Sequence, residues 1–209
     1  MTWLGKLLKS DRKRRDSPED VVRFYQGLGF FAGADPAAVI RRYVDDFGGP
    51  PNPAKRWDDA ELLTLSDNDV WADDQEADVC PENRVYEEVV AQWAAISHGA
   101  FAPSGITEMW DSEHGPVTVS FHFDGNLVSV RPLYKDDWID MEILLRINRL
   151  IAASGYQFEA TDLGNTAVVL CLTAAEKEAI RRKREVRATQ MPLRFIKHLD
   201  SERYSSINA

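Results

Sequence analysis

Carboxylates, an aromatic ring and a histidine stand close together in the segment Glu108-Met-Trp-Asp111-Ser-Glu113-His114. Carboxylates with an imidazole could bind a divalent metal ion or share a proton in acid–base catalysis. No second group of ligands at a suitable spacing accompanies them, and Gly115-Pro116 indicates a turn. We therefore expect neither a metal nor a catalytic residue here, and interpret the segment as a polar turn that contacts a partner. The residues predicted to make this contact are Glu108, Trp110, Asp111 and Glu113.

Two further acidic clusters have simpler interpretations than ligand binding. The segment Asp67–Asp74 has the composition of a calcium loop, but an EF-hand needs glycine at its sixth position and glutamate at its twelfth, where Ala72 and Asp78 stand. The segment Asp136-Asp-Trp-Ile-Asp140 precedes an apolar helical pattern. We expect its carboxylates, with Asp137 at the cap, to bind the free N–H groups of a helix N-terminus.

Motifs of the common enzyme classes are absent from the sequence. No P-loop, dinucleotide-binding, nucleophile-elbow, Cys-x-x-Cys or His-Glu-x-x-His motif occurs. The two cysteines, Cys80 and Cys171, stand far apart, which excludes a disulfide framework and a thiolate zinc site and fits a reducing cytosol. We therefore expect a cytoplasmic protein that needs no cofactor.

Charge is strongly segregated along the chain, whose 209 residues carry a formal net charge of −9. Residues 58–89 hold twelve acids and one basic residue, Arg84. A concentrated acidic surface speeds association with a basic protein partner, and tryptophan is favoured as an anchor in such interfaces. We accordingly predict that a partner contacts four residues of this window: Asp69, Trp71, Asp73 and Asp74.

Nucleic acid and stable membrane insertion are not expected. The basic stretches at 1–15 and 181–187 are short, and the acidic chain lacks the interleaved aromatic residues of a nucleic-acid module. No run approaches the ~20 apolar residues of a membrane span. The basic block at 11–15 follows the apolar stretch Trp3–Leu8, an order that a secretory signal does not have. Whether residues 1–15 touch a membrane surface as an amphipathic helix stays open.

Local patterns predict the elements that must position these residues. Capping motifs or helical periodicity predict helices that begin near residues 18, 36, 83, 138 and 174. Alternating apolar residues predict strands around 117–123, 126–130 and 156–160. The uninterrupted apolar run at 167–172 predicts a central strand that is covered on both faces.

These elements predict an α+β fold with a helical N-terminal third. We expect one antiparallel sheet of four to five strands, built from the hairpins 117–131 and 156–172 and packed with helices. The helix 138–153 should pack on the sheet through Ile143, Ile147 and Leu150, and residues 168–170 should be almost fully buried. The expected regions are a helical part at 1–57, an acidic connector at 58–82, an α+β core at 83–190 and a tail at 191–209.

Several motifs between Glu87 and Glu176 carry a family resemblance. They are Ile106-Thr-Glu-Met-Trp110, the hairpin from Val117 to Val130, Asp137-Trp-Ile-Asp140 followed by Ile147-Asn148, and Leu172-Thr-Ala-Ala-Glu176. Together they resemble the cytosolic immunity proteins of bacterial polymorphic-toxin systems. The resemblance implies a small acidic α+β protein that binds one cognate toxin, blocks its active site and has no chemistry of its own.

The acidic window agrees with this implication, because toxins that act on nucleic acids or nucleotides commonly present basic clefts. Two other functions stay open: an adaptor or secretion-chaperone-like protein without catalysis, and a carboxylate-dependent enzyme outside the known motifs. The neighbouring gene discriminates the first two, since an immunity gene stands beside a toxin gene. An enzyme should instead have carboxylates that converge in a concave pocket.

Overall fold

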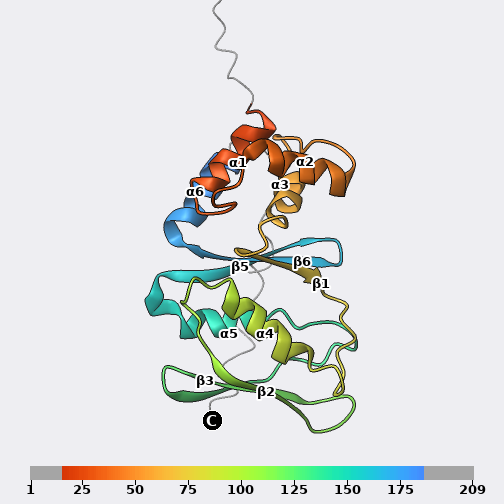
Figure 1. Cartoon of the computed structure of the whole chain (residues 1–209). Helices are drawn as coiled ribbons and strands as arrows, with labels where there is room; N and C mark the ends of the chain where they lie inside the picture. Colours follow the sequence, from red (N-terminus) through yellow and green to blue (C-terminus); the bar gives the residue numbers. More distant parts are fainter. Residues whose placement is uncertain (1–15, 186–209) are drawn as a thin grey trace, which may run out of the picture.

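The computed structural model describes residues 16–185, which form four layers (Figure 1). Four helices make the first layer, a three-stranded sheet the second, two helices the third and another three-stranded sheet the fourth. Both sheets are antiparallel. The fold is therefore α+β with a helical N-terminal third, as the sequence predicts. The predicted tail at 191–209 and the basic segment 1–15 lie outside the described residues.

Local capping motifs determine where the helices of the first layer begin. Ser17 Oγ accepts a hydrogen bond from Asp20 N, and the Asp20 carboxylate accepts one from Ser17 N, which completes the predicted capping box. Asp35 caps the next helix, and Thr173 pairs with Glu176 in the same reciprocal way. The helices of this layer are α1 (Pro18–Gln26), α2 (Pro36–Phe47), α3 (Arg56–Leu63) and α6 (Ala174–Glu185).

The sheet of the second layer has the strand order β1 (Val70–Asp74), β6 (Thr166–Thr173), β5 (Tyr156–Leu163). Residues 167–172 of the central strand β6 are all buried, so the predicted burial of 168–170 is confirmed. Their even-numbered side chains enter a core beneath the first-layer helices. Their odd-numbered side chains enter a second core, which the third and fourth layers complete. A single strand, β6, therefore contributes side chains to both hydrophobic cores of the described residues.

The sheet of the fourth layer contains β2 (Ser104–Trp110), β3 (Val117–Phe123) and β4 (Asn126–Val130) in that order. The turn between β3 and β4 is Asp124-Gly125, and both residues have positive φ angles of 48° and 76°. A two-residue type I′ turn requires this backbone conformation, and glycine adopts it readily. The alternate residues of β3 that face the third layer have no exposed surface: Val117, Val119 and Phe121.

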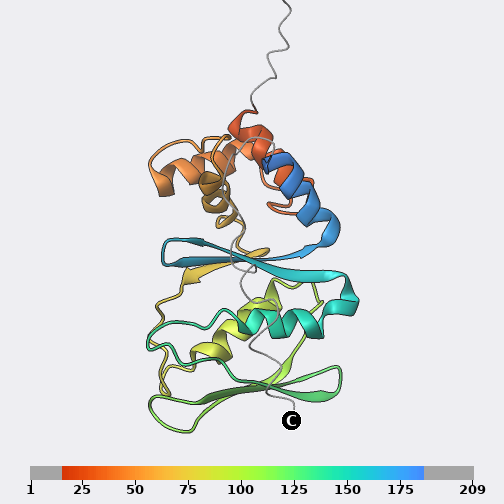
Figure 2. The same ribbon diagram turned by 180° about the vertical axis from the view of Figure 1, so that it is seen from behind.

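Two helices, α4 (Val85–Ala95) and α5 (Ile143–Leu150), lie between the two sheets in both views (Figures 1 and 2). A 3-10 turn at Ala152–Ser154 follows α5. Ile143 and Ile147 are buried in the core that also receives β3 and β6, and Leu150 packs against it half-buried. The predicted packing of this helix is therefore confirmed.

The structure has two separate sheets in place of the predicted single sheet, because each hairpin pairs with a different third strand. The hairpin β3–β4 pairs with β2, whereas β5–β6 pairs with β1. The sequence pattern does not predict β1, since only Val70 and Trp71 are buried in it and the remaining residues are exposed. The predicted helix 138–153 also begins later, at Ile143, and no side chain caps it within the described residues.

Ile147→Ala should lower the free energy of unfolding by about 2–5 kcal/mol, because it leaves a cavity at a side chain with no exposed surface. Urea denaturation monitored by tryptophan fluorescence measures this change. Arg149→Ala, on the exposed side of the same helix, is the control and should change the free energy by about 0.5 kcal/mol or less. Equal effects of the two substitutions would contradict the assigned packing.

Cys171 should react with a thiol reagent only when the protein unfolds. Its side chain lies in β6 with 1% of its surface exposed, and burial, together with the nearby Glu176 charge, raises the pKa of the thiol to about 12. The thiol therefore stays protonated between pH 7 and 10, and the reactive thiolate does not form. A Cys80→Ser protein, which retains only Cys171, should show no fast-reacting thiol before urea is added.

Candidate functional site

A buried carboxylate, Asp140, organises the loop 131–142. Its oxygens accept hydrogen bonds from Leu133 N (2.8 Å) and Lys135 Nζ (2.6 Å), and its own N–H donates to Tyr86 Oη (2.9 Å). Burial, with the charges of nearby carboxylates, raises the pKa of the Tyr86 phenol, which therefore stays protonated. Charge-assisted hydrogen bonds of this kind are strong, and leaving a buried carboxylate without its partners is costly. The carboxylate thus fixes the shape of the loop, and the Asp140 N–H holds the loop against α4.

The same loop contacts two segments that are distant in sequence. Near its start, the Tyr134 ring packs edge-on against Trp110, with 5.9 Å between ring centroids, and lies at the same distance from His114. Near its end, two backbone hydrogen bonds of 2.8 Å join residues 137–139 to residues 75–77. The loop therefore connects the end of β1 with the turn between β2 and β3.

The segments 73–78, 111–114 and 134–138 consequently share one side of the molecule, on the right in Figure 1 and on the left in Figure 2. Lys135 is the only lysine or arginine in them, and Asp140 neutralises its charge. We call their eight carboxylates the acidic surface; all are exposed, and none forms an ion pair with a described residue. They are Asp73, Asp74, Glu76, Asp78, Asp111, Glu113, Asp136 and Asp137.

Four residues predicted to contact a partner lie on the acidic surface. Asp73 and Asp74 are at the end of β1, and Asp111 and Glu113 are in the turn after β2. Trp110 stands next to this turn, half-exposed, and packs against the loop that connects the two places. The structure thus brings together two groups that the sequence presents separately, and their contact with a partner stays a prediction.

Trp71 and Asp69 lie elsewhere. The Trp71 side chain is 6% exposed; its indole N–H donates to Gln92 Oε1 (2.6 Å), and its ring packs edge-on against Trp93. This burial leaves a partner almost no surface to contact, so we correct the candidate site by omitting Trp71. Asp69 precedes β1 at the opposite end from the acidic surface, where it accepts a hydrogen bond from Ser66 Oγ (2.8 Å).

Glu108 has a structural role that the sequence analysis did not anticipate. Its Oε2 atom accepts hydrogen bonds from Tyr86 N (2.9 Å) and Glu87 N (3.1 Å) in the first turn of α4. Its Oε1 atom accepts one from Trp110 Nε1 (2.7 Å). The residue that precedes the helix, Arg84, provides no side-chain cap. Glu108 therefore caps α4 from the neighbouring strand, and we omit it from the candidate site as well.

Sequence reasoning missed the centre of the acidic surface. Asp136 and Asp137 were expected to cap a helix, but both are exposed, and α5 begins only at Ile143, seven and six residues later. Between them and the buried Ile139 stands Trp138, with 38% of its surface exposed. A tryptophan directly after two aspartates is the signal that could have indicated a contact surface there.

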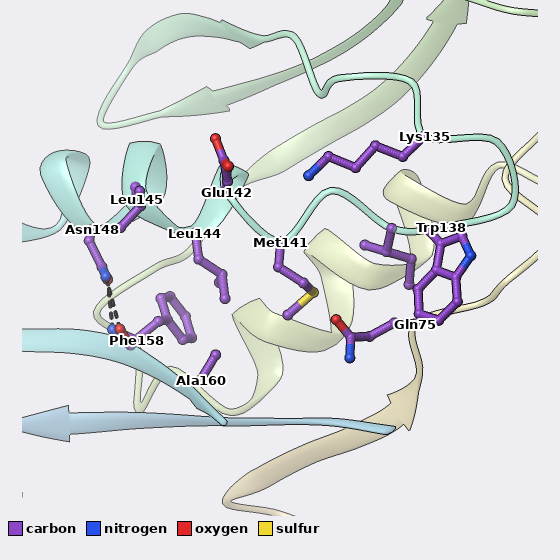
Figure 3. Close-up of a pocket in the computed structure, with 11 residues that line it drawn as sticks. Gln75, Lys135, Trp138, Met141, Glu142, Leu144, Leu145, Asn148, Phe158 and Ala160 are labelled. Atoms are coloured by element: carbon purple, nitrogen blue, oxygen red, sulfur yellow. Dashed lines mark hydrogen bonds between the residues drawn. The ribbon is translucent and has the colours of Figure 1, made fainter. Parts of the chain in front are cut away.

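A pocket of about 310 Å³ opens beside Trp138, between the start of α5 and strand β5 (Figure 3). Glu142 is the only carboxylate in its lining, so the described residues do not provide the converging carboxylates of an acid–base site there. The apolar lining residues include Trp138, Met141, Leu144, Leu145, Phe158 and Ala160.

Neither ligand clusters nor known proteins assign a chemistry to this surface. Residues 16–185 contain no group of three or more histidine, cysteine, aspartate or glutamate side chains placed to hold a metal ion. No helix in that range has the length and apolar content needed to cross a bilayer. No family model matches the chain, and neither a curated protein nor a solved structure matches it.

Glu108→Ala should destabilise the protein by about 1–3 kcal/mol, because it leaves two N–H groups of α4 and the Trp110 indole without their acceptor. Glu113→Ala is the matched control: the same residue type is removed from an exposed position without an ion pair, and the change should stay within about 0.5 kcal/mol. Thermal and urea unfolding of both variants measure the difference, and similar losses would refute the capping role.

Proposed function

We propose that this protein binds a basic protein partner through the acidic surface, acting without catalysis as a cytoplasmic immunity protein that neutralises a cognate bacterial toxin or effector domain. The observation that carries the proposal is the set of eight exposed carboxylates without an ion pair among the described residues. Three segments that are distant in sequence contribute to it, and the loop that Asp140 organises contacts the other two.

Like charges gathered on one surface repel one another and disfavour folding. Ion pairing with nearby lysines or arginines would relieve this repulsion, yet the one lysine in these segments is engaged by Asp140. The negative potential of the acidic surface is therefore not cancelled, and it acts on molecules that approach the protein. It attracts a basic partner over about one Debye length, ~8 Å at physiological ionic strength, and raises the rate of encounter.

Aromatic side chains stand among the carboxylates in the arrangement that stable interfaces use. Trp110 and Tyr134 are half-exposed and pack against each other, and Trp138 is exposed at the mouth of the pocket. Interfaces concentrate binding energy in such aromatic residues, while a polar rim provides orientation and steering. Both components of a specific protein interface are thus present on one side of the molecule.

The double substitution Asp111→Lys/Asp137→Lys should slow association with the product of the adjacent gene by about tenfold or more at low salt, because it reverses two charges of the steering potential. The difference should shrink at 1 M salt, where the Debye length is about 3 Å. Stopped-flow or surface-plasmon kinetics at two salt concentrations measure both effects.

The control is Asp45→Lys/Asp124→Lys, which changes the net charge equally at two exposed aspartates without an ion pair. One lies in α2 and the other in the turn between β3 and β4, at the far end of β3 from residues 111–114. This variant should associate nearly as fast as the wild type. An association rate that ignores both salt and the Asp111/Asp137 reversal would overturn the electrostatic part of the proposal.

Protection of cells separates immunity from adaptor function. Expression of the adjacent gene alone should poison the host cell, and co-expression of the wild-type chain should restore growth. The Asp111→Lys/Asp137→Lys chain should protect less than the Asp45→Lys/Asp124→Lys chain at equal expression. Binding without any toxicity or protection would favour an adaptor, and absence of binding to any neighbouring product would refute the immunity proposal.

A further inference from the structure

The pocket beside Trp138 is open to an apolar occupant because its own polar groups are already bonded. Asn148 lies at one end, where its amide donates to Phe158 O (2.9 Å) and accepts from Phe158 N (2.6 Å) (Figure 3). At the other end, Gln75 Nε2 donates to Asn165 O (3.2 Å) and Lys135 is paired with Asp140. Apart from Glu142 at the start of α5, which also has an interaction partner, the remaining walls are hydrocarbon and aromatic.

The side chains of the apolar wall come from both sides of the pocket. Figure 3 shows Met141 and Leu144 directed from the start of α5 toward β5, where Phe158 and Ala160 form the opposite wall. Ala160 has the smallest side chain among these residues and is half-buried, so space remains in front of it. A volume of about 310 Å³ is at the lower end of ligand pockets and suits one large side chain.

The mouth of the pocket belongs to the acidic surface. Three lining residues come from its segments: Gln75 between two acidic neighbours, Lys135 beside Asp136, and Trp138 after Asp137. A group that enters the pocket must therefore approach through negative potential. Cationic residues next to an apolar side chain complement that approach, whereas acidic residues oppose it.

We infer that the pocket receives one bulky apolar side chain, aromatic or branched aliphatic, which the basic partner presents between lysine or arginine residues. This inference rests on the proposed function and identifies the anchor of that interface. The partner's cationic residues face the acidic surface and set the association rate. The apolar side chain displaces water from the pocket, packs on Trp138 and sets the rate of dissociation.

Three synthetic peptides serve as probes with the full chain: Lys-Lys-Phe-Lys-Lys, Lys-Lys-Ser-Lys-Lys and Glu-Glu-Phe-Glu-Glu. NMR titration at low salt should show the indole signal of Trp138 shifting with the first peptide alone. Its affinity should exceed that of the serine peptide by about tenfold or more, the gain expected from burying one phenylalanine. The acidic peptide should not bind measurably.

Ala160→Leu fills the pocket and should reduce the affinity for the phenylalanine peptide to that of the serine peptide, which itself should not change. Ala91→Leu adds the same atoms at an exposed position of α4 and should leave all affinities unchanged. Trp138→Ser removes a wall of the pocket from an exposed loop, so it tests the same inference without filling the interior.

The outcomes separate this inference from the proposed function. Equal affinities of the two basic peptides, unaffected by Ala160→Leu and Trp138→Ser, would overturn the pocket inference and leave electrostatic binding intact. Binding of the acidic peptide as tight as that of its basic counterpart would overturn the assignment of a basic partner. If neither basic peptide binds, the proposed function and the pocket inference both fail.

Discussion

Alternate side chains of β6 enter two different hydrophobic cores, and both halves of the described molecule depend on this strand. Val168 faces the helices of the first layer, while Val169 faces the core between the two sheets. A strand with both faces covered cannot alternate apolar with polar residues, since every side chain is removed from water. Truncating a side chain on either face therefore weakens a core on one side and shifts the strand that supports the other. The two cores are expected to unfold together.

Local signals in the sequence predict most of the elements, because each signal is itself a short-range interaction. Ser17 with Asp20 and Thr173 with Glu176 begin helices through hydrogen bonds between neighbours in the chain. The alternation in β3 likewise predicts its buried face. The division into two sheets is not local. It depends on β1 pairing with β6, a hundred residues later, and β1 has only two buried side chains to indicate it.

The candidate site, like the division into two sheets, depends on contacts between residues that are distant in sequence, and local patterns do not predict such contacts. Asp73, Asp74, Asp111 and Glu113 are recognisable from the clustering of charge in the sequence. Their common location depends on the loop that Asp140 holds. A carboxylate that accepts hydrogen bonds from backbone N–H groups can either cap a helix or fix a loop. The role of Asp140 is therefore ambiguous until its partners are known. Glu108 is a similar case, because its bonds join a strand to residues of a helix that lie 22 and 21 positions earlier in the chain.

Because β1 lies at an edge of its sheet, its acidic residues have a second effect. β1 is one of the two outer strands of its sheet, so one side of its backbone has no partner strand among the described residues. Such a border can recruit a strand from another molecule and start aggregation. Asp73 and Asp74 occupy the last two positions of β1, and an approaching strand would have to bring its own backbone alongside two exposed charges. The residues assigned to partner recognition thereby also disfavour the pairing of two copies of this protein through β1.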